Sequence, residues 1–256
     1  VLITSPQDLC ATEEFHNGNN SVYYMGKYDR KQHVFHYENV YSLDDGLDFY
    51  ASQTMLAPDG RRIMIGWMQS WDSNIRPANQ KWSCMMTLPR ELRIKHGKIL
   101  QCPVREIEKY HRNAVCYQDK EISGNCQMEG ICGRVLDMTV EIVRGDFRQF
   151  TISLAQNERY HTDFTILKDS NMVEIDRTYS GMVRDTIAIR KAKMKTSTDK
   201  LQLRFILDKY SVEIFLNDGQ QVLSSTFYTP IEADGIRFVC DGKAVVNIQK
   251  YDIVVD

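Results

Sequence analysis

The chain has 256 residues, of which 43% are hydrophobic and 26% are charged, and its formal net charge is −2. This length suggests one large or two ordinary domains, and the composition is that of a globular protein with a real core. The slight acidity and the lack of a dense Lys/Arg cluster argue against a nucleic-acid partner or an anionic membrane surface. No apolar run is long enough to cross a membrane. We therefore expect no nucleic-acid partner and no membrane partner.

The seven cysteines and six histidines are scattered along the chain. No CxxC pair occurs, and no Cys/His spacing is typical of a structural zinc site. Buried reduced thiols in a cytoplasmic protein are favoured over a disulfide framework. We therefore expect a cytoplasmic protein without a metal site.

Apolar and polar residues alternate along most of the first hundred residues, with turn signals about every ten residues, which is typical of an all-β protein. The expected strands cover residues 1–4, 21–28, 35–41, 53–56, 62–68, 84–88 and 91–95. Pro58-Asp59-Gly60 and His96-Gly97 are turn signals between them.

Pro103 opens the one segment with helical spacing, and we expect a helical linker over residues 103–114. From residue 115 to residue 256 the alternation becomes cleaner, and Asn217-Asp218-Gly219 and Asp241-Gly242 are hairpin signals. Many short antiparallel strands of this kind predict a β-sandwich.

Residues 43–92 concentrate the aromatic and acidic side chains of the first half. All three tryptophans, Trp67, Trp71 and Trp82, lie in this stretch, as does the pair Phe49-Tyr50. Aromatic faces beside carboxylates suit a neutral polar ligand such as a sugar, because the rings cover its C–H faces. From spacing alone, tryptophans that only fill a core are an equal alternative.

Three motifs in this stretch resemble glycoside hydrolase family 32, which includes invertases, sucrose-6-phosphate hydrolases, inulinases and levanases. They are DDGLDFYASQT (44–54), DGRRIMIGWMQSW (59–71) and WSCMMTLPREL (82–92). Further segments with this resemblance are GKILQCPVREIEKY (97–110), DRTYSG (176–181) and LRFILDKYSVEIFLNDGQQVLSS (203–225). The resemblance therefore extends over essentially the whole chain.

The resemblance implies a five-bladed β-propeller followed by a C-terminal β-sandwich. Residues 1–102 would form the C-terminal, incomplete part of the propeller, residues 103–114 the linker and residues 115–256 the sandwich. The family mechanism is retaining and uses a pair of carboxylates, one as nucleophile and one as acid/base. It needs no cofactor.

The sequence departs from the family at the catalytic motifs. The nucleophile lies in an Asn-Asp-Pro motif, the transition-state stabiliser in Arg-Asp-Pro and the acid/base in Glu-Cys-Pro, and none of these occurs in the chain. Cys102-Pro103 follows Gln101, so it is not the acid motif. We therefore assign no catalytic residue, expect these carboxylates in a missing N-terminal half or a partner chain, and expect this chain alone to be inactive.

The resemblance implies five substrate-binding residues. Trp67 matches a position along the fructosyl subsite, with core packing as the alternative. Asp48 and Tyr50 match a segment near the acid/base, where a carboxylate raises the pKa of that group; a solvated turn is the alternative for Asp48. Trp71 and Trp82 flank the polar loop 72–81, which could form the rim at the leaving-group subsites, although Trp82 is assigned more to structure than to contact.

Two charged pairs complete the predictions. Arg90 and Glu91 are expected to form an internal ion pair near the domain junction. Asp208 and Glu213 are expected on a solvated strand edge, or at a homodimer contact through the sandwich.

The predicted function is the C-terminal portion of a retaining β-fructofuranosidase that acts on sucrose, sucrose-6-phosphate or short fructans. The alternative is a non-catalytic β-sandwich module for carbohydrate binding or assembly.

Overall fold

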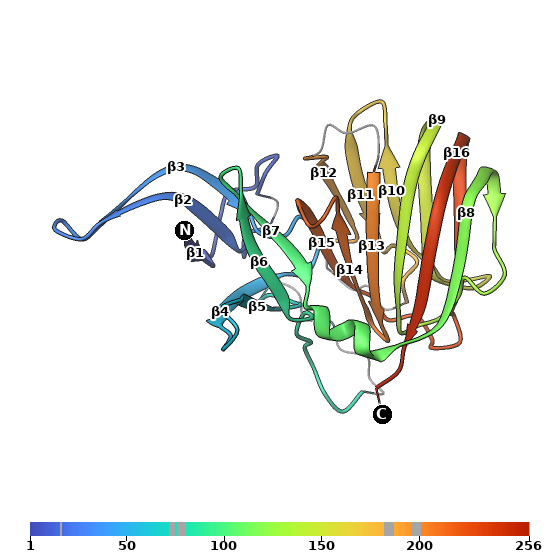
Figure 1. Ribbon diagram of the computed structural model, residues 1–256, viewed down its shortest axis with the longest axis horizontal. Helices are drawn as coiled ribbons and strands as arrows, with labels where there is room; N and C mark the ends of the chain where they lie inside the picture. Colours follow the sequence, from blue (N-terminus) through green and yellow to red (C-terminus); the bar gives the residue numbers. More distant parts are fainter. Residues whose placement is uncertain (16, 72–74, 76–79, 182–186, 196–200, 256) are drawn as a thin grey trace.

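The computed structural model describes residues 1–256 except for 16, 72–74, 76–79, 182–186, 196–200 and 256. Strands dominate, and the only helix that the described residues form is the 3-10 helix η1 (Arg105–Tyr110). Figure 1 shows two lobes, with strands β1–β7 in one lobe, strands β8–β16 in the other, and η1 between them. The predicted all-β fold is confirmed.

The first lobe consists of two antiparallel sheets of sequential strands. One has the order β1-β2-β3 and the other β4-β5-β6-β7. Their bounds are Leu2–Thr4 (β1), Val22–Asp29 (β2), Val34–Ser42 (β3), Tyr50–Leu56 (β4), Arg62–Trp67 (β5), Arg90–Lys95 (β6) and Lys98–Pro103 (β7). A small shared core of Tyr23, Leu43, Phe49, Met64 and Ile99 joins the two sheets. Such up-and-down sheets are the units of which propeller blades are made.

Two details of this lobe differ from the sequence prediction. The expected strand at 84–88 is wrong: it is reduced to an isolated bridge between Met86 and Trp67, because Cys84 has a φ of 72°, outside the extended region. Strand β4 begins earlier than expected, at Tyr50. A bulge follows, with Ala51 at a φ of 50°.

The second lobe is a sandwich made from one curled sheet. Its strands are β8 (His111–Cys126), β9 (Leu136–Gln156), β10 (Thr162–Leu167), β11 (Met172–Asp176), β12 (Ile189–Lys193), β13 (Leu201–Asp208), β14 (Ser211–Leu216), β15 (Gln221–Thr226) and β16 (Gly235–Ile253). The first half of β9 pairs with β13 and its second half with β10, while β16 follows its other edge along the whole length. Bulges bend these long strands, so that the sheet folds over onto itself.

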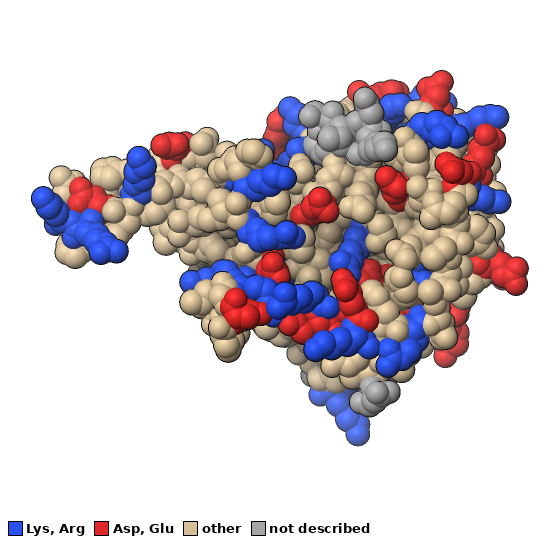
Figure 2. Space-filling model, in the orientation of Figure 1, with Lys and Arg blue, Asp and Glu red and all other residues tan. Residues whose placement is uncertain are grey.

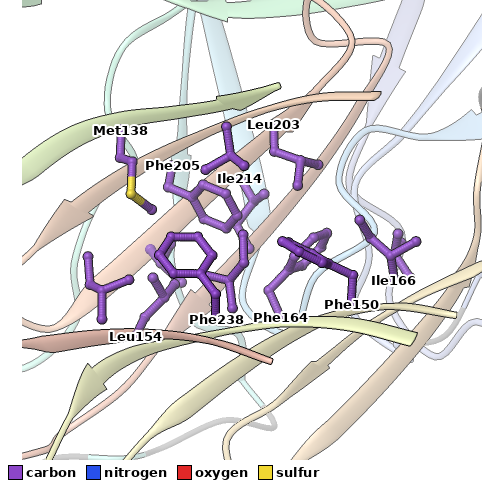
Figure 3. Packing of buried hydrophobic residues seen from close by; sticks show 14 of the residues in the cluster. Met138, Phe150, Leu154, Phe164, Ile166, Leu203, Phe205, Ile214 and Phe238 are labelled. Carbon is purple, nitrogen blue, oxygen red and sulfur yellow. The ribbon is translucent and has the colours of Figure 1, made fainter. Parts of the chain in front are cut away.

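The sandwich core lies between the two layers (Figure 3). Phe150 and Phe238 pack with ring centroids 6.3 Å apart, and Phe164 meets Phe205 edge-on at 5.6 Å. Full burial of one such side chain contributes about 1.5–3 kcal/mol. The alternation in the sequence places these rings inside, because successive side chains of a strand point to opposite faces.

The segment between the lobes is shorter than the predicted linker of 103–114. Pro103 ends β7, η1 covers Arg105–Tyr110, and β8 begins directly at His111. Glu106 on η1 forms an ion pair with Arg61, with Oε1 and Nη2 2.6 Å apart, which fixes η1 to the β4–β5 hairpin. Figure 2 shows basic and acidic side chains interspersed over this face of the molecule.

Candidate functional site

Three of the predicted sugar-contacting residues form one aromatic cluster. Tyr50 and Trp67 are register partners on β4 and β5, and their ring centroids lie 6.3 Å apart. Trp71 packs edge-on against Trp67 at 5.3 Å and is 70% exposed. The Tyr50 hydroxyl donates a hydrogen bond of 3.1 Å to the carbonyl of Ser5, which ties the cluster to the segment that directly follows β1. Tyr50 is itself buried, at 4% exposed, so the exposed part of this aromatic cluster is formed by Trp67 and Trp71.

Gly66 lets this hairpin close over the neighbouring aromatic side chain. A Cβ at Gly66 would lie 2.4 Å from Cε2 of Phe49, well inside van der Waals contact. The Gly66 amide also donates a 2.9 Å hydrogen bond to Oγ1 of Thr87. The glycine of the IGW motif is therefore required by the close approach of Phe49.

Replacing Gly66 by alanine is expected to lower the free energy of unfolding by about 1–3 kcal/mol, because the added methyl overpacks the site. The displaced Phe49 ring should also shift the Trp67 fluorescence maximum. Urea unfolding with tryptophan fluorescence measures both. Exposed Thr54 on β4 provides the control, since Thr54→Ala adds no atom to the core. Equal stability of the two variants would contradict this packing.

Trp82 lies in a second aromatic group, made with the sandwich. Its ring centroid is 6.1 Å from that of Tyr210, which in turn stacks on Tyr228 at 5.9 Å. Trp82 is 45% exposed. Of the polar loop 72–81, residues 72–74 and 76–79 lie outside the described residues, so the predicted rim is described only at its ends.

Gln69 connects the two aromatic groups. It follows Trp67 by two residues, and its Nε2 donates to the Tyr228 hydroxyl at 3.2 Å and to the Ile75 carbonyl at 2.9 Å. Burial raises the pKa of Tyr228, and the nearby charge of Asp48 raises it further. Sequence reasoning missed Gln69, Tyr210 and Tyr228, because their partners lie far away along the chain.

Asp48 lies at the junction of the lobes and is 1% exposed. Its Oδ2 accepts hydrogen bonds from the Thr226 amide at 2.7 Å and from the Thr226 hydroxyl at 2.8 Å, and it pairs with the Arg177 guanidinium. Arg177 belongs to the DRTYSG segment. The solvated-turn alternative is therefore wrong, and the predicted contact of Asp48 with the acid/base or the sugar stays a prediction.

Arg90 is fully buried at the same junction, but its partners are not those expected. Its Nη1 lies 3.0 Å from Asp44 Oδ2 and its Nη2 lies 2.6 Å from Glu213 Oε2, whereas Glu91 lies 3.6 Å from Arg61. The predicted Arg90–Glu91 pair is wrong, because neighbouring side chains on a strand point to opposite faces.

Glu213 is correspondingly not on a solvated strand edge. It is buried against Arg90, and its Oε1 accepts a 2.6 Å hydrogen bond from the Leu88 amide. Asp208 is exposed, and its register partner across the β13–β14 hairpin is Ser211, whereas that of Glu213 is Ile206. The two acidic residues thus do not form a pair.

Comparison with known proteins agrees with this two-lobed arrangement. The family model described as "Glycosyl hydrolases family 32 N-terminal domain" matches residues 1–103, and "Glycosyl hydrolases family 32 C terminal" matches residues 106–254. The chain belongs to glycosyl hydrolase family 32. Similar curated proteins include a sucrose-6-phosphate hydrolase of Staphylococcus xylosus (31% identical over 99% of this chain and 52% of that protein) and a raffinose invertase of Escherichia coli (34% over 84% and 44%).

Solved structures of the family share the fold. An exo-inulinase from Aspergillus awamori superposes with a TM-score of 0.81 at 20% identity, over 98% of this chain and 52% of that one. A sucrose-6-phosphate hydrolase from Lactobacillus gasseri gives 0.78 at 23% identity, over 93% and 48%. The predicted last blades of a propeller followed by a sandwich are therefore confirmed. The chain spans about half the length of these relatives.

Within this family-32 chain, the described residues contain no group of three or more His, Cys, Asp or Glu side chains placed to hold a metal ion. No helix in the described part of the chain is long and apolar enough to cross a membrane.

Proposed function

We propose that the chain forms part of the substrate funnel and the whole sandwich of a retaining β-fructofuranosidase acting on sucrose, sucrose-6-phosphate or short fructans. The observation that carries this proposal is the cluster of Tyr50, Trp67 and Trp71 at the end of the β4–β5 hairpin. Tyr50 is buried and supports the cluster from beneath, whereas the rings of Trp67 and Trp71 are at least partly exposed and offer the apolar surface on which a fructosyl unit packs.

The chemistry of the proposed reaction needs two carboxylates at close range, one as nucleophile and one as acid/base. The sequence holds none of the three family motifs that carry such groups. Asp44 and Asp48 of the 44–54 motif are both buried and accept hydrogen bonds from Ser224 and Thr226 of the sandwich. We therefore propose that the chain contributes binding surface, that further polypeptide supplies the reacting carboxylates, and that the chain alone is inactive.

Apolar side chains on the propeller lobe support the proposed need for further polypeptide. Outside the aromatic cluster, several are 60% exposed or more: Met55, Leu56, Met86 and Ile94. Large apolar side chains gathered on one lobe are typical of surfaces that another segment covers.

Co-expression with the N-terminal half of the Staphylococcus xylosus relative tests the proposal. The chain alone should not hydrolyse sucrose or sucrose-6-phosphate, whereas the pair should release fructose. Turnover by the purified chain alone, or a stable pair without activity, would count against the proposal.

In the active pair, Trp67→Ala is expected to lower kcat/KM about tenfold to a hundredfold, because the fructosyl ring loses an aromatic face worth on the order of 1–3 kcal/mol. Tyr179→Ala is the control, since Tyr179 is an exposed ring on the sandwich. Unchanged kcat/KM in the Trp67 variant would remove this residue from the sugar site.

The cytoplasmic location and a homodimer through the sandwich also remain proposals. All seven cysteines are free thiols, which supports a reducing compartment. The expectation that these thiols are buried is wrong, because only Cys240 is buried and the other six lie wholly or partly at the surface. Sedimentation of the purified chain at several concentrations tests the homodimer.

A further inference from the structure

The sandwich carries a polar pocket of its own, of about 270 Å³, on the outer face of its sheet beside η1. Its lining residues are Glu108, His111, Asp137, Thr139, Arg204, Gln249 and Tyr251. None of them belongs to the aromatic cluster of the propeller lobe. The pocket is therefore separate from that cluster.

The register of strands β9, β13 and β16 brings the lining residues of this pocket together. Thr139 on β9 is the register partner of both Arg204 on β13 and Gln249 on β16, so the three form one row across the sheet. Asp137 and Tyr251 are partners in the next row. Because these positions alternate with core residues such as Met138, their side chains share the outward face.

An ion pair between buried Asp137 and partly exposed Arg204 forms the floor of the pocket. Asp137 is 3% exposed, and its two oxygens accept hydrogen bonds from Nε and Nη2 of Arg204 at 2.9 and 2.6 Å. His111 Nε2 lies 2.9 Å from Oδ2 of the same carboxylate. A guanidinium held through two nitrogens has a fixed plane, so the donors and acceptors of the floor are preorganised.

A stacked aromatic pair forms one wall. The rings of His111 and Tyr251 lie 4.3 Å apart at an angle of 8°, and Tyr251 is partly exposed. The Tyr251 hydroxyl lies 2.5 Å from Nε2 of Gln249, which restricts its ring. The wall thus combines a rigid flat surface with polar tips.

We propose that this pocket binds one unit of a neutral saccharide, independently of the propeller site. An anion would meet the carboxylates of Glu108 and Asp137, and a cation would meet Arg204, so the mixed charges favour a neutral ligand. Hydroxyl groups donate and accept, which suits the carboxylate, guanidinium, amide and hydroxyl groups of the lining. The volume lies just below the range of about 300–1,000 Å³ for drug-sized ligands, as expected for one sugar unit.

Calorimetric titration of the chain with the trisaccharide 1-kestose, which offers both glucosyl and fructosyl units, tests the proposal. Tyr251→Ala should weaken binding about tenfold, through loss of the flat wall. Thr139→Val, which keeps the shape and removes one hydroxyl, should weaken it about threefold. The matched control is Tyr179→Ala, because Tyr179 also packs against a histidine, with its centroid 5.0 Å from that of His161. This control should bind like the unchanged chain.

Trp67→Ala separates this proposal from the proposed function. Binding that persists in Trp67→Ala and weakens in Tyr251→Ala and Thr139→Val places the sugar in the sandwich pocket. Binding lost in Trp67→Ala and unchanged in the two pocket variants overturns the inference and leaves the propeller site standing. No binding of 1-kestose at millimolar concentration also overturns it, whatever the co-expression assay shows.

Discussion

Replacing Arg90 by methionine is expected to lower the free energy of unfolding by on the order of 3–5 kcal/mol. Arg90 has no exposed surface, and its loss would leave Asp44 and Glu213 buried without their shared cation. Burial lowers the pKa of Arg90, but the charges and hydrogen bonds of Glu213 and Asp44 together raise it by more, so the guanidinium remains charged. The substitution therefore removes the one positive charge that compensates the buried carboxylates of Asp44 and Glu213 in these two ion pairs.

Urea unfolding followed by circular dichroism measures this effect. Because Arg90 joins β6 of the propeller lobe to β14 of the sandwich, the variant should also show separate transitions for the two lobes. Arg93→Met is the matched control, as Arg93 lies on the same strand with a side chain that is 57% exposed. The control should lose less than about 0.5 kcal/mol. A single transition and an equal loss in both variants would show that Arg90 does not hold the junction together.

The second large effect is a fall in stability as the pH rises, caused by Asp45. This carboxylate is buried between the lobes, 2.7 Å from Nε2 of Gln221 and 2.9 Å from Nζ of Lys195. Burial raises the pKa of Asp45 from 3.8 to about 6, and the attraction of Lys195 offsets this only in part. Asp45 therefore binds its proton more tightly in the folded protein than in the unfolded chain.

The sign follows from the raised pKa. A group that binds its proton more tightly in the folded state contributes stability that is complete below the unfolded pKa of 3.8. This contribution is lost as the pH rises through the folded pKa of about 6. The total loss is about 3 kcal/mol, because a tenfold difference in proton affinity between the folded and unfolded states corresponds to about 1.4 kcal/mol.

Urea unfolding of the unchanged chain and of Asp45→Asn, between about pH 4 and about pH 7, checks this. Between about pH 4 and about pH 7 the stability of the variant should rise by about 2.5 kcal/mol relative to that of the unchanged chain, since the variant lacks the titrating group and part of the total loss lies below about pH 4. Ser42→Ala, which alters the same junction without removing a titrating group, should differ from the unchanged chain by a constant amount. A pH-independent difference for Asp45→Asn would rule out Asp45 as the cause.

The sequence was a good guide wherever the structure depends on neighbouring residues. Alternation placed Leu136, Met138, Val140 and Ile142 on one face of a strand, and all four are buried in the sandwich core. It failed at 84–88, where the sequence still looks extended but Cys84 has a positive φ. A single backbone angle of this kind leaves no trace in the apolar pattern.

In the candidate site, too, contacts within one hairpin could be predicted from the sequence, whereas contacts between the lobes could not. Tyr50 and Trp67 meet because they pair across a single hairpin, whose turn at Pro58-Asp59-Gly60 is visible in the sequence. Trp82 has the same residue type and lies nearby in the chain, yet it contacts Tyr210 of the sandwich. No local pattern distinguishes these two environments.

By itself, the sequence determined the all-β fold, the succession of a propeller part and a sandwich, the family and the aromatic hairpin, because alternation, turn chemistry and motifs are local. Only the tertiary structure decided which charged residues serve the junction. Asp48 pairs with Arg177, and Arg90 with Asp44 and Glu213, across long stretches of chain. The physical reason is that a buried charge requires a partner of opposite sign in space, wherever that partner lies in the sequence.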